Sequence, residues 1–492
     1  LMFSLLNFFS AFYLLPFYVS EVPWINSDIF SFLWLSVIIS LLMALLLDEK
    51  IPWASKFRSA YLSPMMVPVA SVILVFQVLF NYNGFVNGVL NWFDIDKIAN
   101  KNILKNIELL YKMNSDAVYK KIAGSNLRKA ELNYDISGIS FGIDTLKRII
   151  NFINYVHTKY KGASIPIKFN LKNVSLTDKC SYALFECICE SLIKNHKHII
   201  SINYSIERDI ITEGIKFSPL LILGRQKNVK QNISDFLDKF KFDINKTHFR
   251  RLIEYEKYKQ GNQLSGLLDE ITWFQNSFDI NYECRDEIAE VIVELVGNAI
   301  EHSMSDCLLD FDIATDYVKK NGESVCGINI AVINFSDIIL GDMLKKKILE
   351  QNINFEPNSK YRFVLQAFEN HKKFFDDVYN EKDFFTLSSF QHKISGRMDN
   401  SITGGTGLTK LIQTIEERAD SHSCYVITGD KKITFEPEYL EYKDGWFGFN
   451  KENDFLNFGP DVGIIDKNSF YMPGTAYNLN FVMKVNKDGK KD

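Results

Sequence analysis

The chain has 492 residues, which is too long for one ordinary hydrophobic core and predicts two or three domains. Its formal net charge of −4 argues against a nucleic-acid-binding surface as the main function, so we expect no nucleic-acid partner. Its seven cysteines are scattered and form no CxxC pair. This excludes a disulfide framework and a zinc site as expectations and favours buried, reduced thiols in a cytosolic compartment.

Three apolar runs, roughly residues 3–19, 29–47 and 63–80, contain almost no charge. The second is long enough to span a bilayer, and the others are near the lower limit of about 17 residues. A buried hydrophobic domain is the alternative, but the lengths favour a transmembrane region over residues 1–93. No basic segment precedes the first run, so a signal peptide is not expected.

The orientation of this region is open. Basic residues follow both the second and the third run, and three full spans cannot place both groups in the cytoplasm. Composition rich in Asn, Lys and Ile fits a bacterial source, so we expect the inner membrane, with the C-terminal domains in the cytoplasm.

A charged helical connector is predicted over residues 94–130, followed by a small α/β domain over 131–228. The second prediction depends on an alternating strand pattern from Ile165 to Leu171, a helix from Tyr182 to Lys194 and a strand from His198 to Tyr204. Residues 229–275 are basic and predict a helical linker.

The string "IKFNLKNVSLTDKCSYALFECICESLI" resembles the STAS domains of anti-sigma-factor antagonists. In that family a strand leads into a helix that carries a phosphorylatable Ser. Lys179 and Cys180 stand near the position expected for that Ser. A generic α/β unit without a phosphorylation site is therefore the alternative.

An amphipathic helix is predicted over residues 285–303, "RDEIAEVIVELVGNAIEHS". Seven apolar residues fall at offsets 0, 3, 4, 7, 8, 11 and 12 from Ile288. Glu294, Asn298 and His302 lie four residues apart and therefore line one side of the helix. Gly297 costs roughly 1 kcal/mol in a helix relative to Ala, and close approach of a ligand is one reason for it.

The segment "ELVGNAIEHS" resembles the N-box of the GHKL superfamily of ATPases and kinases, and in particular that of the anti-sigma-factor serine kinases. The resemblance implies that Asn298 coordinates Mg²⁺ bridging the phosphates of ATP, and that Glu294 is the catalytic general base. Oxygen ligands and substrate phosphates suit such a hard cation. For His302 we expect a packing or hydrogen-bonding role at the helix end.

A Gly-rich segment, "SGRMDNSITGGTGLTKLIQTI", begins at residue 395. Gly404, Gly405 and Gly407 precede a helix predicted to start near Leu408, and such a backbone forms an anion site with the helix N-terminus. The segment is neither a P-loop nor a Rossmann fingerprint. It resembles the Gly-x-Gly-Leu box of GHKL proteins, which implies nucleotide contacts there. We include Arg397 among the nucleotide-binding candidates.

The chain end predicts two further strands. "SCYVITGDKKITF" has the pattern of a hairpin that turns at Gly429–Asp430, and "PGTAYNLNFVMKV" alternates Tyr477, Leu479, Phe481 and Met483 on one face. GHKL sheets commonly end in Gly-Thr before such a strand, and Gly474 and Thr475 match, so the resemblance implies that Thr475 is a nucleotide-binding residue. The resemblance covers residues 276–486 and implies an α/β sandwich.

One GHKL box departs from the family pattern. The family has Asp-x-Gly-x-Gly after a strand, and its Asp accepts a hydrogen bond from adenine. Here the strand "GINIAVIN" ends in Asn334, with Asp337 nearby and no glycine. Both residues are candidates for reading the base, although Asn334 could equally cap the turn after the strand. Residues 338–400 would form an unusually long lid.

We therefore expect an α+β protein with N-terminal transmembrane helices, a small STAS-like α/β domain and a C-terminal GHKL-type sandwich. The expected function is a membrane-anchored regulator or sensor that binds ATP and Mg²⁺, with a protein partner or homodimer. One alternative is a serine/threonine kinase of the anti-sigma type acting on a STAS-like partner, and another is a module that binds nucleotide without consuming it. A conventional sensor histidine kinase is disfavoured, because no His stands in a phosphoacceptor context.

Overall fold

The computed structural model describes residues 105–115, 131–138, 140–160, 164–206, 210–225, 228–259, 261, 263–278, 282–318, 324–350, 359–391, 394 and 421–484. Residues 102–492 form one compact unit, and this unit contains all of the elements below. It is a mixed α/β structure built around one parallel and one antiparallel sheet.

The smaller sheet is parallel. Its central strand is β3 (Ile167–Leu176), which pairs with β1 (Leu132–Asp135) and β2 (Ser140–Phe141) along one edge and with β4 (Ile200–Ile206) along the other. The crossover helices are α7 (Ile143–Lys159) and α8 (Lys179–Lys194). The strand, helix and strand predicted within residues 165–204 are thus confirmed.

Short helical elements surround this sheet. They are η2 (Lys105–Ile107), α6 (Glu108–Met113), α9 (Ile210–Ile215), η3 (Pro219–Gly224) and α10 (Val229–Lys241). Phe236 and Phe240 of α10 are buried against α8 and the start of the second sheet, which accounts for the helical spacing of apolar residues there.

The larger sheet has seven antiparallel strands in the order β10-β13-β8-β7-β6-β5, with β9 also paired to β13. Its strands are β5 (Phe242–Asn245), β6 (His248–Ile253), β7 (Cys307–Val318), β8 (Ser324–Asn334), β9 (Ser421–His422), β10 (Tyr425–Thr434) and β13 (Ile465–Lys484).

Two sequence predictions about these strands are wrong. The predicted helical linker over 229–275 contains the β5–β6 hairpin, whose residues continue the sheet through pairing with β7. The hairpin predicted at Gly429–Asp430 is absent, because β10 runs through both residues and pairs with β13 on either side. Gly429 has a φ of +57° and lies where the pairing register shifts, so it forms a bulge instead of a turn.

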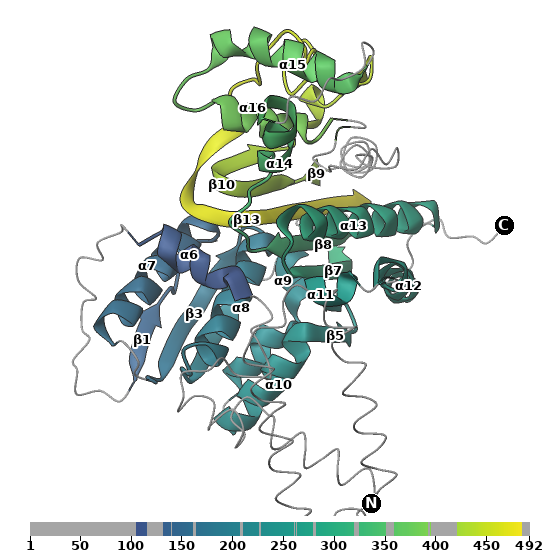
Figure 1. Ribbon diagram of the computed structural model, residues 1–492. Helices are drawn as coiled ribbons and strands as arrows, with labels where there is room; N and C mark the ends of the chain where they lie inside the picture. The colour runs from purple at the N-terminus through teal and green to yellow at the C-terminus, as the bar shows by residue number, and fades with distance from the viewer. Residues whose placement is uncertain are drawn as a thin grey trace, which may run out of the picture. The chain divides into compact units, whose positions relative to one another are not determined.

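The larger sheet is covered on both faces, as Figure 1 shows for α13 on one side and α8 and α9 on the other. Side chains alternate between the two faces of the sheet along β8. One set packs in the core with α13 (Ile328, Ile330 and Val332), and the other packs in the core with α8 (Ala331 and Ile333). Helix α13 also packs against α12 (Gln263–Gln275), and α12 in turn contacts the short helix α11 (Tyr255–Tyr258).

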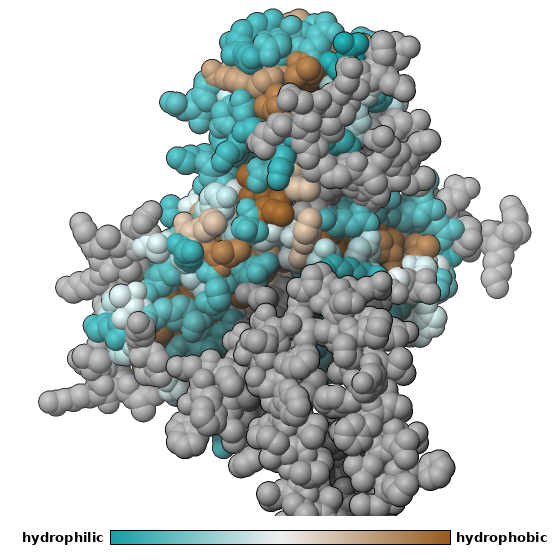
Figure 2. Space-filling view, in the orientation of Figure 1, coloured by the Kyte–Doolittle hydropathy of each residue, from teal (hydrophilic) through white to brown (hydrophobic). Residues whose placement is uncertain are grey.

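A helical insertion connects β8 to the C-terminal strands. It includes α14 (Asp342–Lys345), the π-helical turn η4 (Lys346–Glu350), α15 (Lys360–His371), η5 (Lys372–Phe374) and α16 (Glu381–Ser388). Aromatic residues such as Phe368 and Phe384 pack at its centre. Figure 2 shows mostly hydrophilic residues on its outer surface. After β10 follow η6 (Pro437–Tyr439), β11 (Tyr442–Lys443) and β12 (Trp446–Phe447).

The predicted N-terminal transmembrane helices are not supported. Within the described residues, no helix combines the length and the apolar character needed to cross a bilayer. The longest described helix, α13, has 22 residues and carries charged side chains along its length. The three apolar runs and the predicted region 1–93 lie outside the described residues.

Candidate functional site

The predicted N-box helix is present as α13 (Tyr282–Ser303), and its predicted apolar stripe is confirmed. The buried residues of the stripe are Ile288, Val291, Ile292, Leu295, Val296, Ala299 and Ile300. Glu294 and Asn298 are half-buried beside this stripe, one turn apart. A carboxylate and an amide thus stand together at the edge of a rigid, packed helix, which suits positioned polar chemistry.

Gly297 has a structural explanation that the sequence did not reveal. A Cβ atom at this position would lie 3.1 Å from Cδ1 of Leu264, so the glycine faces helix α12. Close packing of two helices therefore accounts for this glycine, and the approach of a ligand is not needed to explain it.

The C-terminal end of α13 meets the end of β8 and the middle of β13. The Nδ2 atom of Asn334 donates to the carbonyl oxygen of Ala299 at 2.8 Å, and the backbone N–H of Thr475 donates to Oδ1 of Asn334 at 2.7 Å. Asn334 is almost fully buried. Its amide thus holds together the helix and the two strands, and both ends of the side chain are engaged within the protein.

Gly474 is required at this junction. It has a φ of +87°, and a Cβ atom there would lie 2.6 Å from the carbonyl oxygen of Asn334 and 2.8 Å from the backbone nitrogen of Ser336. The Gly-Thr pair identified in the sequence therefore lies beside Asn334, but within β13 and not before a strand as expected, and Thr475 is buried there. Asp337 follows on the exposed side of the turn.

The remaining sequence candidates cannot be placed. Arg397, Gly404, Gly405, Gly407 and Leu408 lie outside the described residues, as does the side chain of His302.

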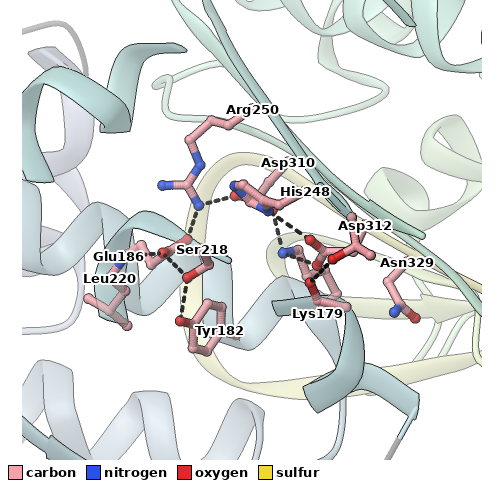
Figure 3. A network of polar contacts seen from close by, with 12 residues as sticks. Lys179, Tyr182, Glu186, Ser218, Leu220, His248, Arg250, Asp310, Asp312 and Asn329 are labelled. Atoms are coloured by element: carbon pink, nitrogen blue, oxygen red, sulfur yellow. Dashed lines mark hydrogen bonds and ion pairs between the residues drawn. The ribbon is translucent and has the colours of Figure 1, made fainter. Parts of the chain in front are cut away.

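A second polar cluster, which the sequence analysis missed, lies on the opposite face of the larger sheet (Figure 3). The ammonium of Lys179, at the start of α8, forms ion pairs with Asp310 and Asp312 of β7. His248 of β6 donates through Nδ1 to Oδ1 of Asp312 at 2.7 Å. All four side chains are fully buried. We call this set, together with Arg250 and Glu186, the buried charge network.

Arg250 extends the network toward helix α8, because one of its guanidinium nitrogens bonds both Asp310 and Glu186. Glu186 Oε1 also accepts from the Ser218 hydroxyl at 3.0 Å and from the Leu220 backbone N–H at 3.1 Å. Three carboxylates thus face two basic side chains and one imidazole. Such burial is tolerated only where charges are paired and hydrogen-bonded.

Alternation along β7 explains where these charges lie. Leu309 and Phe311 face α13, so Leu308, Asp310 and Asp312 face α8. The signal in the sequence was the pair of acids at alternate positions of the otherwise apolar segment "CLLDFDI". Their partners lie 60 residues or more away in the chain, which is why the pattern alone did not identify the network.

Burial shifts the acid–base properties of the network. It lowers the pKa of Lys179 to about 8 and that of Arg250 to about 9. Burial alone would raise the pKa of Asp312, but the neighbouring Lys179 and His248 hold it below its usual value. The pKa of His248 is lowered by burial, which favours the neutral imidazole.

His248, Asp310 and Asp312 have the donor atoms and spacing of a metal site. However, the Lys179 ammonium pairs with both carboxylates and supplies positive charge where a metal ion would. The residues therefore fit an internal ion-pair network better than a metal centre.

Comparison with known proteins gave no match to any protein-family model, to any curated protein or to any solved structure.

Proposed function

We propose that this chain is a regulatory protein that binds a magnesium–nucleotide complex, ATP in the first instance, beside helix α13. In this proposal Asn298 provides an oxygen ligand to Mg²⁺, and Glu294 orients or deprotonates the group that attacks the terminal phosphate. The proposal extends the resemblance of the segment from Glu294 to Ser303 to the N-box of GHKL proteins.

The observation that carries the proposal is the junction of α13 with β8 and β13. Asn298 is adjacent in sequence to Ala299, whose carbonyl oxygen bonds Asn334, and Asn334 in turn bonds Thr475. Two segments that resemble GHKL boxes, the N-box and the Gly-Thr pair, therefore meet at Asn334, which stands where the family has its base-reading Asp. A chance N-box pattern on an unrelated helix gives no reason for this convergence.

The proposed function has two versions, which differ in whether the bound ATP is consumed. A half-buried Glu294 one turn before Asn298 favours hydrolysis or phosphotransfer, including the serine kinase alternative. Engagement of both ends of the Asn334 amide inside the protein favours a second candidate function, a module that binds nucleotide without consuming it. In that case the base is recognised by other groups, among which the exposed Asp337 is the first to test.

The experiment is a comparison of full-length wild type with Asn298→Ala and Glu294→Gln. Calorimetric titration measures Mg²⁺-ATP binding, and labelled ATP measures release of phosphate to water and transfer to protein. Glu290→Gln is the matched control for Glu294→Gln, because Glu290 is exposed one turn earlier on the same helix. Loss of binding in Asn298→Ala, with binding but no turnover in Glu294→Gln, is the expected result. Equal binding by wild type and Asn298→Ala contradicts the proposal.

A further inference from the structure

A pocket of about 440 Å³ lies on the face of the larger sheet opposite α13. The start of α7 and the residues just before α8 line one side of it, and β10 and β13 line the other. It thus lies between the small parallel sheet with its helices and the larger sheet. We call it the α7 pocket.

The beginning of helix α7 provides backbone donors. Its N-cap residue is Gly142, so no side chain caps the first turn of this 17-residue helix. The first amide groups of a helix have no partner within the helix and attract anions. A side chain at Gly142 would collide with the Thr177 hydroxyl, so the glycine keeps the backbone close to the pocket wall.

Two lysines complement these donors. Lys432 of β10 and Lys467 of β13 both line the pocket, and the ammonium of Lys432 lies 4.6 Å from the centre of the Tyr425 ring. Asp178 also lines the pocket, but its carboxylate accepts hydrogen bonds from the Ser181 backbone N–H at 2.6 Å and from the Thr177 hydroxyl at 2.9 Å. Asp144, exposed in the first turn of α7, is the other acidic group.

Asn468 provides an independent indication of a ligand. Its side chain lines the pocket and is only 8% exposed. Its Nδ2 atom donates to the carbonyl oxygen of Phe470 at 2.7 Å, whereas Oδ1 has no hydrogen-bond partner in the part of the chain that the structure describes. Leaving a buried acceptor unpaired costs about 1–3 kcal/mol, so a ligand that donates a hydrogen bond is favoured here.

We propose that the α7 pocket binds a small phosphorylated compound that carries hydroxyl groups, such as a sugar phosphate. The phosphate bonds the first amides of α7 and pairs with Lys432 and Lys467, and a hydroxyl donates to Oδ1 of Asn468. The volume suits such a ligand, since small-molecule sites commonly measure about 300–1,000 Å³. The ligand bridges the small sheet unit and the larger sheet, on the face away from the proposed nucleotide site.

The test is calorimetric titration of the full-length chain with ribose 5-phosphate, ribose and inorganic phosphate. Ribose 5-phosphate should bind, ribose should not, and inorganic phosphate should bind at least tenfold more weakly. Binding of ribose alone, or no binding of ribose 5-phosphate, overturns the proposal.

Variants locate the binding. Lys467 is exposed, so Lys467→Glu should fold normally and weaken ribose 5-phosphate binding at least tenfold. Lys443→Glu makes the same charge change at an exposed position on β11, outside the pocket, and should bind like wild type. Lys432→Gln serves as the second pocket variant and should also weaken binding. If Lys467→Glu and Lys443→Glu bind ribose 5-phosphate with equal affinity, the ligand binds outside the α7 pocket and the proposal is overturned.

Discussion

Lys179→Met tests whether the buried charge network secures helix α8 to the larger sheet. Methionine keeps much of the side-chain volume but removes the ammonium that pairs with both Asp310 and Asp312. Removing one partner from a buried ion pair typically costs about 3–5 kcal/mol, because it leaves an uncompensated charge. Arg250 still pairs with Asp310, and His248 still donates to Asp312, so we expect the lower end, about 3 kcal/mol.

Hydrogen exchange of the α8 and β7 amides is the appropriate assay. The described unit has two hydrophobic cores and exceeds the size at which two-state unfolding is expected, so local opening is more informative than one global free energy. A loss of about 3 kcal/mol corresponds to roughly a hundredfold faster exchange through opening, since each 1.4 kcal/mol is a factor of ten.

Two further variants complete this test. Lys372→Met makes the same change at the C-cap of α15, where the lysine pairs with Glu369 at 2.6 Å and the two side chains are 50% and 61% exposed. Its effect should be at most about 1 kcal/mol, because exposed ion pairs contribute little. The double variant Lys179→Met/Asp312→Asn should recover part of the loss, because the uncompensated carboxylate is also removed. Exchange in Lys179→Met within threefold of wild type would refute the reasoning.

Three other predictions concern single positions. Gly297→Ala should change the free energy of unfolding by less than about 1 kcal/mol in a denaturant titration. The alanine has a higher helix propensity, which offsets the close contact of its Cβ with the flexible end of the Leu264 side chain. A large loss of stability would show that the contact between α13 and α12 cannot adjust. Gly474→Ala should destabilise the folded protein by more than about 1 kcal/mol, because the residue has a φ of +87° and an added Cβ would collide with the Asn334 backbone. A melting temperature equal to that of wild type contradicts this prediction. Burial lowers the pKa of His371 to about 4, and its ring nitrogens bond the Tyr379 hydroxyl and the Phe455 carbonyl oxygen, each at 2.6 Å. The unfolded state therefore binds more protons, so this contribution to stability is complete above pH 6.5 and is lost as the pH falls from 6.5 toward 4. An NMR titration of the imidazole with a midpoint at 6.5 would contradict that prediction.

The sequence predicted elements well where one periodicity covered many residues. Helix α13 and its buried stripe followed from the 3.6-residue spacing, and β3 followed from strict alternation near Phe169. The predicted turn at Gly429–Asp430 was wrong because a glycine with positive φ suits a bulge as well as a hairpin. The predicted helical linker was wrong over β5 and β6, because Phe249 and Leu252 are apolar at a spacing that fits a helix, whereas they lie on opposite faces of β6; α10, α11 and α12 are helical as expected.

The functional site was harder to predict than the secondary structure, because its contacts join distant parts of the chain. The sequence identified Asn334 and Thr475 as candidates and the structure brings them into contact, but only the structure shows that the Asn334 amide is engaged at both ends. The buried charge network depends on pairing between Lys179 and strands that follow much later in the chain. Periodicity assigns a residue to a face, but it does not identify the residue that lies opposite.

The most direct test of the central claim is calorimetric titration of the full-length chain with ATP, in the presence of Mg²⁺ and in its absence. Binding should require Mg²⁺, should be lost in Asn298→Ala and should be retained in Glu290→Gln. It should also slow hydrogen exchange in the C-terminal half of α13. Mg²⁺-ATP binding that is unchanged in Asn298→Ala, or no binding by wild type, would contradict the claim that α13 forms a nucleotide site.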